Sequence, residues 1–276
     1  IIILLSTIFS YKVRANYFSF HKQLYFIRSH IAKHSSKQKQ CLLFHAASAG
    51  EYEQIKPILR LINRKKYFIV QSFTSPTIYN QEKKSKLCDI VCYHPFDLLW
   101  LSLGFFLSIK PAKYIITRHD LWPGHIMIAK ALRIPIYYIN ANIHNNSIWT
   151  KPYLKFFSAY LLKKLDKIIV PSDVIAKNLY KLNISKQKIF IHTDSRFSQI
   201  LYRKIKTQNK QLLPNIFLNN TTTIFGSIDQ QDEDIIFQSL KTCYPLGSVD
   251  LEKKQHCLIF VPHEINAQSI NILTNH

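Results

Sequence analysis

The stretch Cys41-Leu-Leu-Phe-His-Ala-Ala-Ser-Ala-Gly-Glu-Tyr52 decides how the rest of the sequence is interpreted. Its apolar, β-prone first half stops at small residues, and the apolar positions after it recur at the i, i+3, i+4 and i+7 spacing of an amphipathic helix. We expect a strand over 41–47, a tight turn allowed by Gly50, and a helix that begins at Glu51. Ligands of open α/β sheets bind at the carboxyl ends of the strands, where a glutamate can act as a general base. The alternative is a first-turn carboxylate that only complements the helix dipole.

Strand-like and helix-like segments alternate along the chain from residue 41 onward. We expect six more strands, over 67–73, 89–93, 114–117, 135–141, 167–170 and 188–192. We expect further helices over 77–86, 96–109, 152–165 and 173–182, and one that begins near Pro123. This alternation predicts an α/β fold with a mostly parallel sheet and helices on both faces. A second series begins with a strand over 221–225, a helix over 232–240 and a strand over 257–261.

These patterns divide the chain into four segments. We predict a basic and apolar membrane-proximal segment over 1–40, a Rossmann-like doubly wound domain over 41–200, a linker over 201–220, and part of a second Rossmann-like domain over 221–276. The linker is predicted from its polar, turn-rich composition. Two strands and one helix are too few to bury a core, so we expect the chain to be a fragment or a truncated product.

The N-terminal segment combines an apolar start with a basic, aromatic continuation. Residues 1–9 are mostly apolar but fall short of the ~20 residues that span a bilayer. Residues 10–40 carry seven Lys or Arg, no Asp or Glu, and several aromatic side chains. Basic and aromatic residues beside an apolar run favour the cytoplasmic surface of a membrane. A loosely structured basic arm is the alternative.

The composition narrows the classes of partner. The formal net charge of +21 favours anionic partners such as lipid, nucleotide, phosphorylated substrate or nucleic acid, although a compositional bias of the genome would also enrich lysine. No helix-turn-helix, zinc-finger or RRM signature occurs, so we expect no nucleic acid partner. The five cysteines form no C-x-x-C pair, and no P-loop, GxGxxG or H-E-x-x-H motif is present. We therefore expect no metal and no cofactor.

Six motifs follow one another along the chain. The first is the string His45-Ala-Ala-Ser-Ala-Gly-Glu51. The other five are Thr117-Arg-His-Asp-Leu-Trp-Pro123, Arg133-Ile-Pro-Ile-Tyr-Tyr-Ile-Asn-Ala141, Thr193-Asp-Ser-Arg-Phe197, Phe225-Gly-Ser227 and Val261-Pro-His-Glu264. In sequence and order these motifs resemble those of one known family, the 3-deoxy-D-manno-octulosonic acid (Kdo) transferases, and the first is similar to that family's signature. The resemblance extends from about residue 41 to the end of the chain, and it implies the GT-B arrangement of two Rossmann-like domains.

The resemblance also implies a reaction. It implies a glycosyltransferase of lipopolysaccharide core biosynthesis that moves Kdo from CMP-Kdo to the lipid A precursor, with inversion, at the cytoplasmic face of the inner membrane. Glu51 would be the general base, and Asp120 occupies a second acidic position where the family usually has glutamate. The alternative for Asp120 is an N-cap of the helix that contains Pro123.

The remaining candidate site residues fall into an acceptor set and a donor set. Ser48 and Gly50 are small residues that let backbone N–H groups approach an anionic ligand. Arg196 matches a basic family position and suits a carboxylate or phosphate, with a plain surface charge as the alternative. Ser227, Pro262 and His263 follow the second-domain strands, and the resemblance implies that they contact the donor nucleotide.

Two departures from the family keep other functions open. The family's glycine-rich donor-binding segment does not occur in the sequence, and His192-Thr193 replaces a turn that usually contains glycine. An inactive, truncated remnant that only binds anionic lipid is therefore one alternative. A GT-B glycosyltransferase with another sugar donor is a second.

Overall fold

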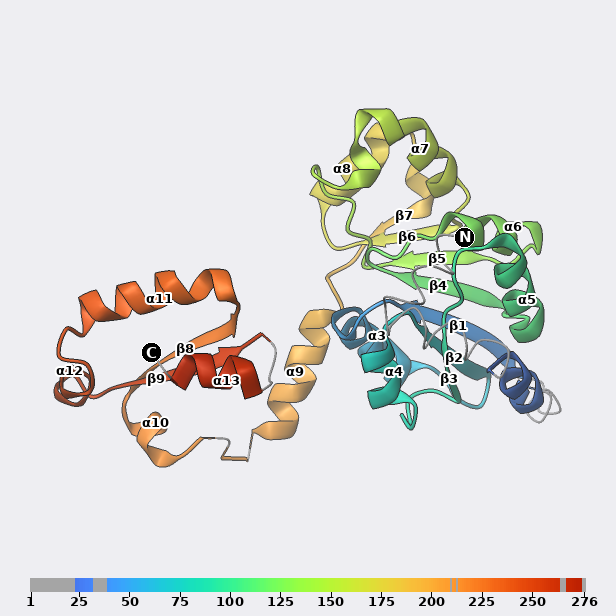
Figure 1. The fold of residues 1–276 in the computed structure, drawn as a ribbon. Helices are drawn as coiled ribbons and strands as arrows, with labels where there is room; N and C mark the ends of the chain where they lie inside the picture. Colours follow the sequence, from blue (N-terminus) through green and yellow to red (C-terminus); the bar gives the residue numbers. More distant parts are fainter. Residues whose placement is uncertain (1–22, 32–38, 209, 212, 264–266, 275–276) are drawn as a thin grey trace. The chain divides into compact units, whose positions relative to one another are not determined.

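The computed structural model describes residues 23–31, 39–208, 210–211, 213–263 and 267–274. The chain forms two compact units, Ile1–Ile205 and Lys206–His276 (Figure 1). The first unit contains a seven-stranded sheet and the second a two-stranded sheet.

The sheet of the first unit is parallel throughout. Its strands run in the order β3-β2-β1-β4-β5-β6-β7. Their bounds are β1 Gln40–Ala46, β2 Tyr67–Phe73, β3 Ile90–Tyr93, β4 Lys113–Thr117, β5 Ile136–Ile139, β6 Lys167–Val170 and β7 Ile189–Ile191. Strands β2 and β3 lie on one side of β1, and strands β4 to β7 lie on the other side. The topological switch point, where open α/β sheets bind ligands, therefore lies between β1 and β4.

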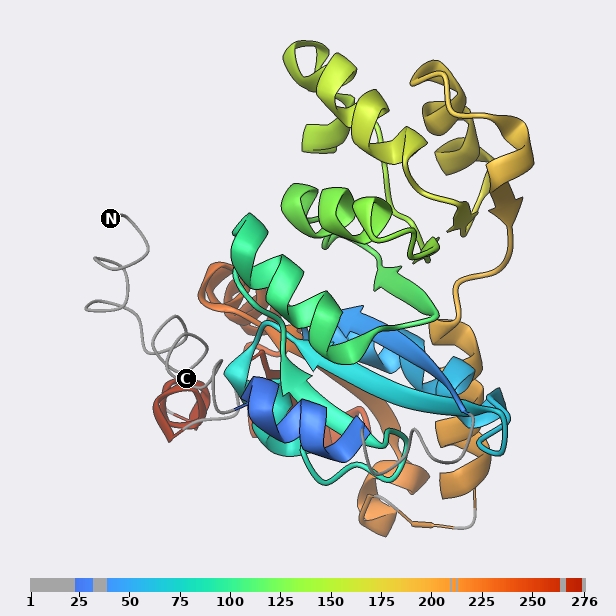
Figure 2. The ribbon, with the colours of Figure 1, turned by 90° about the vertical axis from the view of Figure 1, so that its right-hand side faces the viewer.

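Helices cover both faces of this sheet (Figure 2). On one face, α3 (Ala49–Leu61) and α4 (Pro76–Glu82) bury apolar side chains against β1 and β2. On the other face lie α5 (Leu99–Ile109), α6 (Pro123–Ala131), α7 (Lys155–Lys163) and α8 (Asp173–Lys181). A parallel sheet buried on both faces explains why the strands are nearly continuous apolar runs. The predicted doubly wound α/β class is confirmed for this unit.

Several predicted boundaries differ from the structure, and one difference changes the role of a site residue. Helix α3 begins at Ala49, because Ser48 is its N-cap and the Ser48 hydroxyl accepts the backbone N–H of Glu51 at 3.4 Å. Gly50 thus lies in the first helical turn, and its φ is not positive. The tight turn that we predicted at Gly50 is wrong.

A helix over residues 23–31 belongs to the first unit and packs against its core. Its Ile27 side chain is 1% exposed within the main apolar core. Arg28 Nε donates to Ser108 Oγ at 2.9 Å, and the Gln23 side chain accepts the Tyr93 backbone N–H at 2.7 Å. The alternative of a loosely structured arm is therefore wrong for these residues. The rest of the predicted membrane-proximal segment that precedes residue 39 lies outside the described residues. Across the part of the chain that is described, no helix is both long and apolar enough to cross a bilayer.

The second unit repeats the β/α pattern on a smaller scale. Strands β8 (Thr221–Ile228) and β9 (His256–Pro262) are parallel, with a register irregularity around Ser227. Its helices are α10 (Asn215–Asn219), α11 (Gln230–Cys243), α12 (Ser248–Lys253) and α13 (Ala267–Thr274). Both strands and the first long helix were predicted, whereas α12 and α13 were not.

The predicted linker over 201–220 is partly helical. Helix α9 (Arg196–Thr207) runs into this interval, and α10 lies inside it. The boundary between the two units, after Ile205, also falls within it. Polar residues such as Lys, Arg and Gln are strong helix formers, so a polar composition alone does not indicate coil. The linker role of this interval stays a prediction.

The packing of residues 23–31 gives a stability prediction. Ile27→Ala removes buried side-chain volume and should lower the free energy of unfolding by ~2–5 kcal/mol. Tyr25→Ala, at a side chain that is 79% exposed on the same helix, should change it by less than ~0.5 kcal/mol. All three tryptophans lie in the first unit, so urea unfolding followed by tryptophan fluorescence reports this unit. Equal effects of the two substitutions would contradict the packing.

Candidate active site at the carboxyl edge of the sheet

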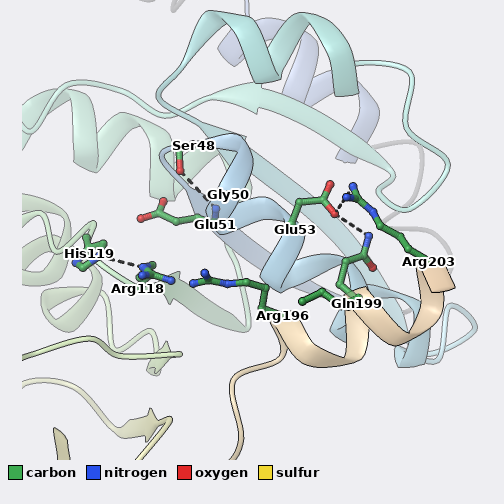
Figure 3. A pocket seen from close by; sticks show the side chains of 10 residues that line it. Ser48, Gly50, Glu51, Glu53, Arg118, His119, Arg196, Gln199 and Arg203 are labelled. Atoms are coloured by element: carbon green, nitrogen blue, oxygen red, sulfur yellow. Dashed lines mark hydrogen bonds and ion pairs between the residues drawn. The ribbon is translucent and has the colours of Figure 1, made fainter. Parts of the chain in front are cut away.

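A pocket of about 410 Å³ opens at the carboxyl edge of the first unit's sheet, next to the switch point (Figure 3). It is formed by the start of α3, the segment after β4 and the first turns of α9. Its lining residues are Ser48, Gly50, Glu51, Glu53, Arg118, His119, Arg196, Gln199, Ile200 and Arg203. All four candidates Ser48, Gly50, Glu51 and Arg196 therefore meet in one pocket.

Glu51 is the carboxylate best suited to accept a proton. It is 5% exposed, and its Oε2 accepts the Ala47 backbone N–H at 2.6 Å. Burial raises the pKa of Glu51 and outweighs the Ala47 N–H, while the nearby charge of Asp120 raises it further. A carboxylate with a raised pKa is a stronger base, which is what general base catalysis near neutral pH requires.

Asp120 lies behind Glu51 and does not line the pocket. Its Oδ2 is hydrogen-bonded to His45 Nε2 and accepts the Thr74 hydroxyl at 3.4 Å. Burial acts to raise the pKa of Asp120, but the charge and hydrogen bond of His45 outweigh it and lower the pKa. Two carboxylates at one sheet edge thus have pKa values shifted in opposite directions, a pattern typical of acid–base sites.

The N-cap alternative for Asp120 is wrong. Helix α6 begins after Trp122 with no side-chain cap from its own N-cap residue. Its free N–H groups are satisfied instead by Asp97, which accepts the backbone N–H of Gly124 at 3.0 Å and of His125 at 2.9 Å. The catalytic role of Asp120 stays a prediction.

Ser48 and Gly50 shape the wall of the pocket beside Glu51. A Cβ added at Gly50 would lie 4.0 Å from Ser48 Oγ, which is an ordinary contact. Glycine is therefore not required there by the backbone or by crowding within the protein. Its small size leaves the backbone open to a ligand.

Arg196 reaches the pocket because the first turns of α9 are held on α3. Gln199 donates to Glu53 at 2.7 Å and accepts from Arg60 at 2.7 Å, while Arg203 pairs with Glu53 at 2.8 Å. The Arg196 side chain is half exposed, and its ion pair with Asp194 is long, at 3.6 Å between the guanidinium nitrogen and the carboxylate oxygen. Such a loose surface pair contributes little energy, so the guanidinium can turn toward an anionic ligand.

Arg118 was not predicted as a site residue. It follows directly after β4, and its φ of 58° lies in the left-handed region. The Tyr138 hydroxyl donates to the Arg118 carbonyl, and the Arg118 N–H donates to the Ile139 carbonyl at 3.1 Å, which fixes this conformation. Uncommon backbone conformations of this kind occur at functional sites. The one feature of the sequence that could have indicated a site role for Arg118 was its position directly after a predicted parallel strand.

The three donor candidates lie together in the second unit. Ser227 is bulged out of β8 with a φ of 64°, and its hydroxyl is 2.8 Å from His263 Nδ1. The His263 backbone N–H donates to Ile228 at 2.8 Å, and Pro262 pairs with Ile228 at the end of β9. Their place at the carboxyl edge of two parallel strands is again a ligand-binding position.

The fold of the chain is similar to that of a solved sugar-nucleotide enzyme. The UDP-GlcNAc 2-epimerase from Methanocaldococcus jannaschii matches with a TM-score of 0.58 over 86% of this chain and 68% of that chain. At 14% sequence identity the likeness concerns the fold alone. It confirms the predicted GT-B-like, Rossmann-like α/β class.

Sequence comparison gives the family. Residues 19–199 match the family model of the 3-deoxy-D-manno-octulosonic-acid transferases (kdotransferases). A probable mitochondrial 3-deoxy-D-manno-octulosonic acid transferase from Arabidopsis thaliana is 32% identical over 45% of this chain and 29% of its own length. The 3-deoxy-D-manno-octulosonic acid transferase from Chlamydia muridarum is 23% identical over 70% of this chain and 46% of its own. The chain belongs to the Kdo transferase family. It matches less than half the length of these two relatives.

The pKa of Glu51 gives a pH-dependent prediction. Because the folded pKa is raised, the folded protein binds this proton more tightly than the unfolded chain does. The contribution of Glu51 to stability should therefore fall as the pH rises from the ordinary value of 4.5 through the folded pKa, with a limiting slope of ~1.4 kcal/mol per pH unit. Glu51→Gln lacks this titration, so it should be more stable than the wild type above that window, and the difference should vanish below it.

Glu53, two residues along α3, serves as the matched control with the opposite sign. Burial acts to raise the pKa of Glu53, but Lys56 and Gln199 outweigh it and lower the pKa. Glu53→Gln should therefore destabilise the protein at neutral pH, and the loss should shrink as the pH falls through the folded pKa. Urea unfolding between about pH 2.5 and pH 8 measures both differences, because the Glu53 contribution is lost only below the ordinary value of 4.5. The same sign for both variants at neutral pH would contradict the account.

Proposed function

We propose that this protein transfers Kdo from CMP-Kdo to a hydroxyl group of the lipid A precursor, with Glu51 as the general base. The observation that carries the proposal is a buried glutamate with a raised pKa, opening into a pocket that also contains Arg118 and Arg196, in a chain of the Kdo transferase family.

The proposed reaction is a single displacement with inversion. Glu51 accepts the proton of the acceptor hydroxyl as its oxygen attacks the anomeric carbon of Kdo. The new carbon–oxygen bond forms on the face opposite CMP, and the bond to the CMP phosphate oxygen breaks with its electron pair leaving on CMP. The negative charge of Asp120 favours the protonated form of Glu51 and so makes it a stronger base.

The arginines of the pocket suit the anionic groups of these substrates. Arg118 and Arg196 both line the pocket beside Glu51 (Figure 3). Guanidinium groups bind carboxylates and phosphates in a bidentate manner. We assign them to anionic groups of the acceptor or of the transferred sugar. Ser227, Pro262 and His263 are the proposed contacts of the second unit to CMP-Kdo.

An exposed aromatic and basic surface supports a location at the cytoplasmic face of the inner membrane. Helices α5 and α7 lie on the same face of the sheet, on either side of α6. Their solvent side carries the exposed side chains Leu99, Trp100, Leu103, Leu107, Phe156, Phe157 and Tyr160, with Lys155 and Lys163 among them. Exposed apolar side chains gathered on one face favour an interaction site, and aromatic and lysine side chains suit an anionic membrane interface.

The catalytic proposal is tested by CMP release. Glu51→Ala should lower the rate of CMP release from CMP-Kdo and lipid A precursor in detergent by at least ~100-fold. Glu82→Gln, on α4 and paired with Lys56, is the control and should keep the wild-type rate. The assay is run on the 276-residue chain and on its complete reading frame. Unchanged turnover in Glu51→Ala would refute the base assignment. A protein that binds lipid but releases no CMP would favour the inactive remnant.

The membrane proposal is tested by vesicle flotation. The wild type should bind phosphatidylglycerol vesicles more than phosphatidylcholine vesicles, and added salt should weaken this binding. Trp100→Ser combined with Phe156→Ser should lower the bound fraction severalfold, because both rings are largely exposed on this surface. Leu61→Ser removes an exposed side chain from α3 on the opposite face and should leave binding unchanged. Equal losses in both variants would contradict the assignment of the surface.

A further inference from the structure

Three histidines form a buried stack on the α5–α6 side of the sheet, behind Asp120. The rings of His45 and His94 lie 3.7 Å apart between centroids, and those of His94 and His125 lie 4.2 Å apart. Each histidine is at most 1% exposed. Burying polar rings in a core costs free energy unless their nitrogen atoms are hydrogen-bonded, so the pattern of these bonds is informative.

Two carboxylates lie at the ends of the stack. Asp120 is bonded to His45 Nε2, and Asp97 lies 2.7 Å from His125 Nδ1. The titratable groups that interact with the charge of His45 are Asp120, Glu51 from α3, His94 after β3 and His125 on α6. Tyr114 on β4 contacts His94. Only the Asp120 end of the stack is next to the pocket residue Glu51.

Ser72 is the junction between the first two histidines. Its hydroxyl oxygen is 3.1 Å from His45 Nδ1, 3.1 Å from His94 Nδ1 and 3.2 Å from the Phe44 carbonyl. Cross-strand pairing of His45 with Ser72 in the register of β1 and β2 brings them together. The hydroxyl has one proton to donate and accepts the other contacts.

The proton on His94 can be assigned from its neighbours. Burial lowers the pKa of His94 well below its usual value, so the ring is neutral. Burial raises the pKa of Tyr114 well above its usual value, so that phenol keeps its proton. The Tyr114 hydroxyl lies 3.3 Å from His94 Nε2. With the phenol as the donor of this pair, His94 carries its single proton on Nδ1 and donates it to Ser72.

The hydroxyl of Ser72 then has two possible orientations. If it donates to the Phe44 carbonyl, His45 Nδ1–H donates to Ser72, and His45 carries two protons. If it donates to His45 Nδ1, His45 is neutral. In both cases His45 Nε2–H donates to the Asp120 carboxylate, which can only accept. Rotation of one hydroxyl therefore accommodates both charge states without breaking the bond to Asp120.

Ser72, His45 and Asp120 are also the residue types of a serine hydrolase triad, but the geometry excludes that chemistry for Ser72. Ser72 is 0% exposed, so its hydroxyl is inaccessible to a substrate. Asp120 binds Nε2 of His45 and Ser72 binds Nδ1, which is the reverse of the triad arrangement.

We propose that His45, set by Ser72, is a positioning residue that keeps Asp120 ionised and so determines which of the two carboxylates, Glu51 or Asp120, takes up the proton. Two neighbouring carboxylates otherwise compete for one proton. The hydrogen bond and charge of His45 favour the anion of Asp120, which leaves Glu51 as the group that is protonated. The functional meaning rests on the proposed role of Glu51 as the base, but the titrations themselves do not.

Carbon-13 NMR of the side-chain carboxyl groups tests this in the full chain, with Asp120→Asn and Glu51→Gln used to assign the signals. In the wild type, Asp120 should titrate at lower pH than Glu51. In His45→Gln, the Asp120 titration should move to higher pH and overlap that of Glu51. In Ser72→Ala, which keeps the ring but removes the acceptor for its second proton, the Asp120 titration should move in the same direction by less.

Ser102→Ala is the matched control. Ser102 is a buried serine of α5 whose hydroxyl donates to Leu98 at 3.0 Å and does not contact the stack. This variant should leave both titrations at their wild-type positions. If His45→Gln folds, an unchanged Asp120 titration in that variant would overturn the proposal. If His45→Gln does not fold, an unchanged Asp120 titration in Ser72→Ala would overturn it. Shifted titrations in a protein that releases no CMP would instead support the positioning role and refute the proposed function.

Discussion

The parallel pairing of β1 with β2 on one side and β4 on the other is the constraint on which the rest of the site depends. Parallel strands bring their carboxyl ends to one edge, so the segments after β1, β2, β3 and β4 supply Glu51, Thr74, His94 and Asp120 from distant parts of the sequence. The same pairing places His45 beside Ser72 inside the sheet. Because helices cover both faces, polar groups at this edge are largely removed from water, and their charges interact strongly.

Burial alone would raise the pKa of every carboxylate at this edge. The two carboxylates nearest the switch point, Glu51 and Asp120, have pKa values shifted in opposite directions because their hydrogen-bond partners differ. Glu51 accepts the Ala47 backbone N–H, yet burial prevails and raises its pKa, whereas Asp120 accepts from His45, which lowers its pKa. The result is a proton acceptor with a negative charge beside it, and this acceptor lines a pocket that also contains three arginines, Arg118, Arg196 and Arg203. This combination suits a reaction that removes a proton from a hydroxyl group and handles anionic substrates.

Local sequence patterns predicted the elements that carry strong local signals. Strand β2 was predicted residue for residue, because Tyr67–Phe73 is a mostly apolar run that ends at the turn Thr74-Ser-Pro76. The position of Glu51 at the start of a helix after a strand followed from the same kind of pattern, although the helix begins two residues earlier than predicted. The meeting of Ser227 with His263 also follows from the placement of each at the end of a parallel strand.

The features that were missed depend on contacts between residues far apart in the chain. Residues 23–31 carry Leu24, Ile27 and Ile31 at helical spacing, but this spacing alone does not show that Ile27 enters the core of the first unit. Helix α9 packs on α3 through the hydrogen bond from Gln199 to Glu53, and the histidine stack brings His45 against His94. Both contacts join residues far apart in the sequence, so no periodic pattern in the sequence indicates them. Arg118 was quoted within a motif, yet its role depends on a left-handed backbone that local patterns do not reveal.

The pH dependence of kcat/KM for the proposed Kdo transfer is the sharpest test of Glu51 as the base, because it reports the pKa of the essential base in the free enzyme. We expect activity to fall on the acid side with an apparent pKa above the ordinary glutamate value of 4.5, and this limb to disappear from the residual activity of Glu51→Gln. An acid limb at or below that ordinary value, or one that persists unchanged in Glu51→Gln, would contradict the assignment of Glu51 as a buried base.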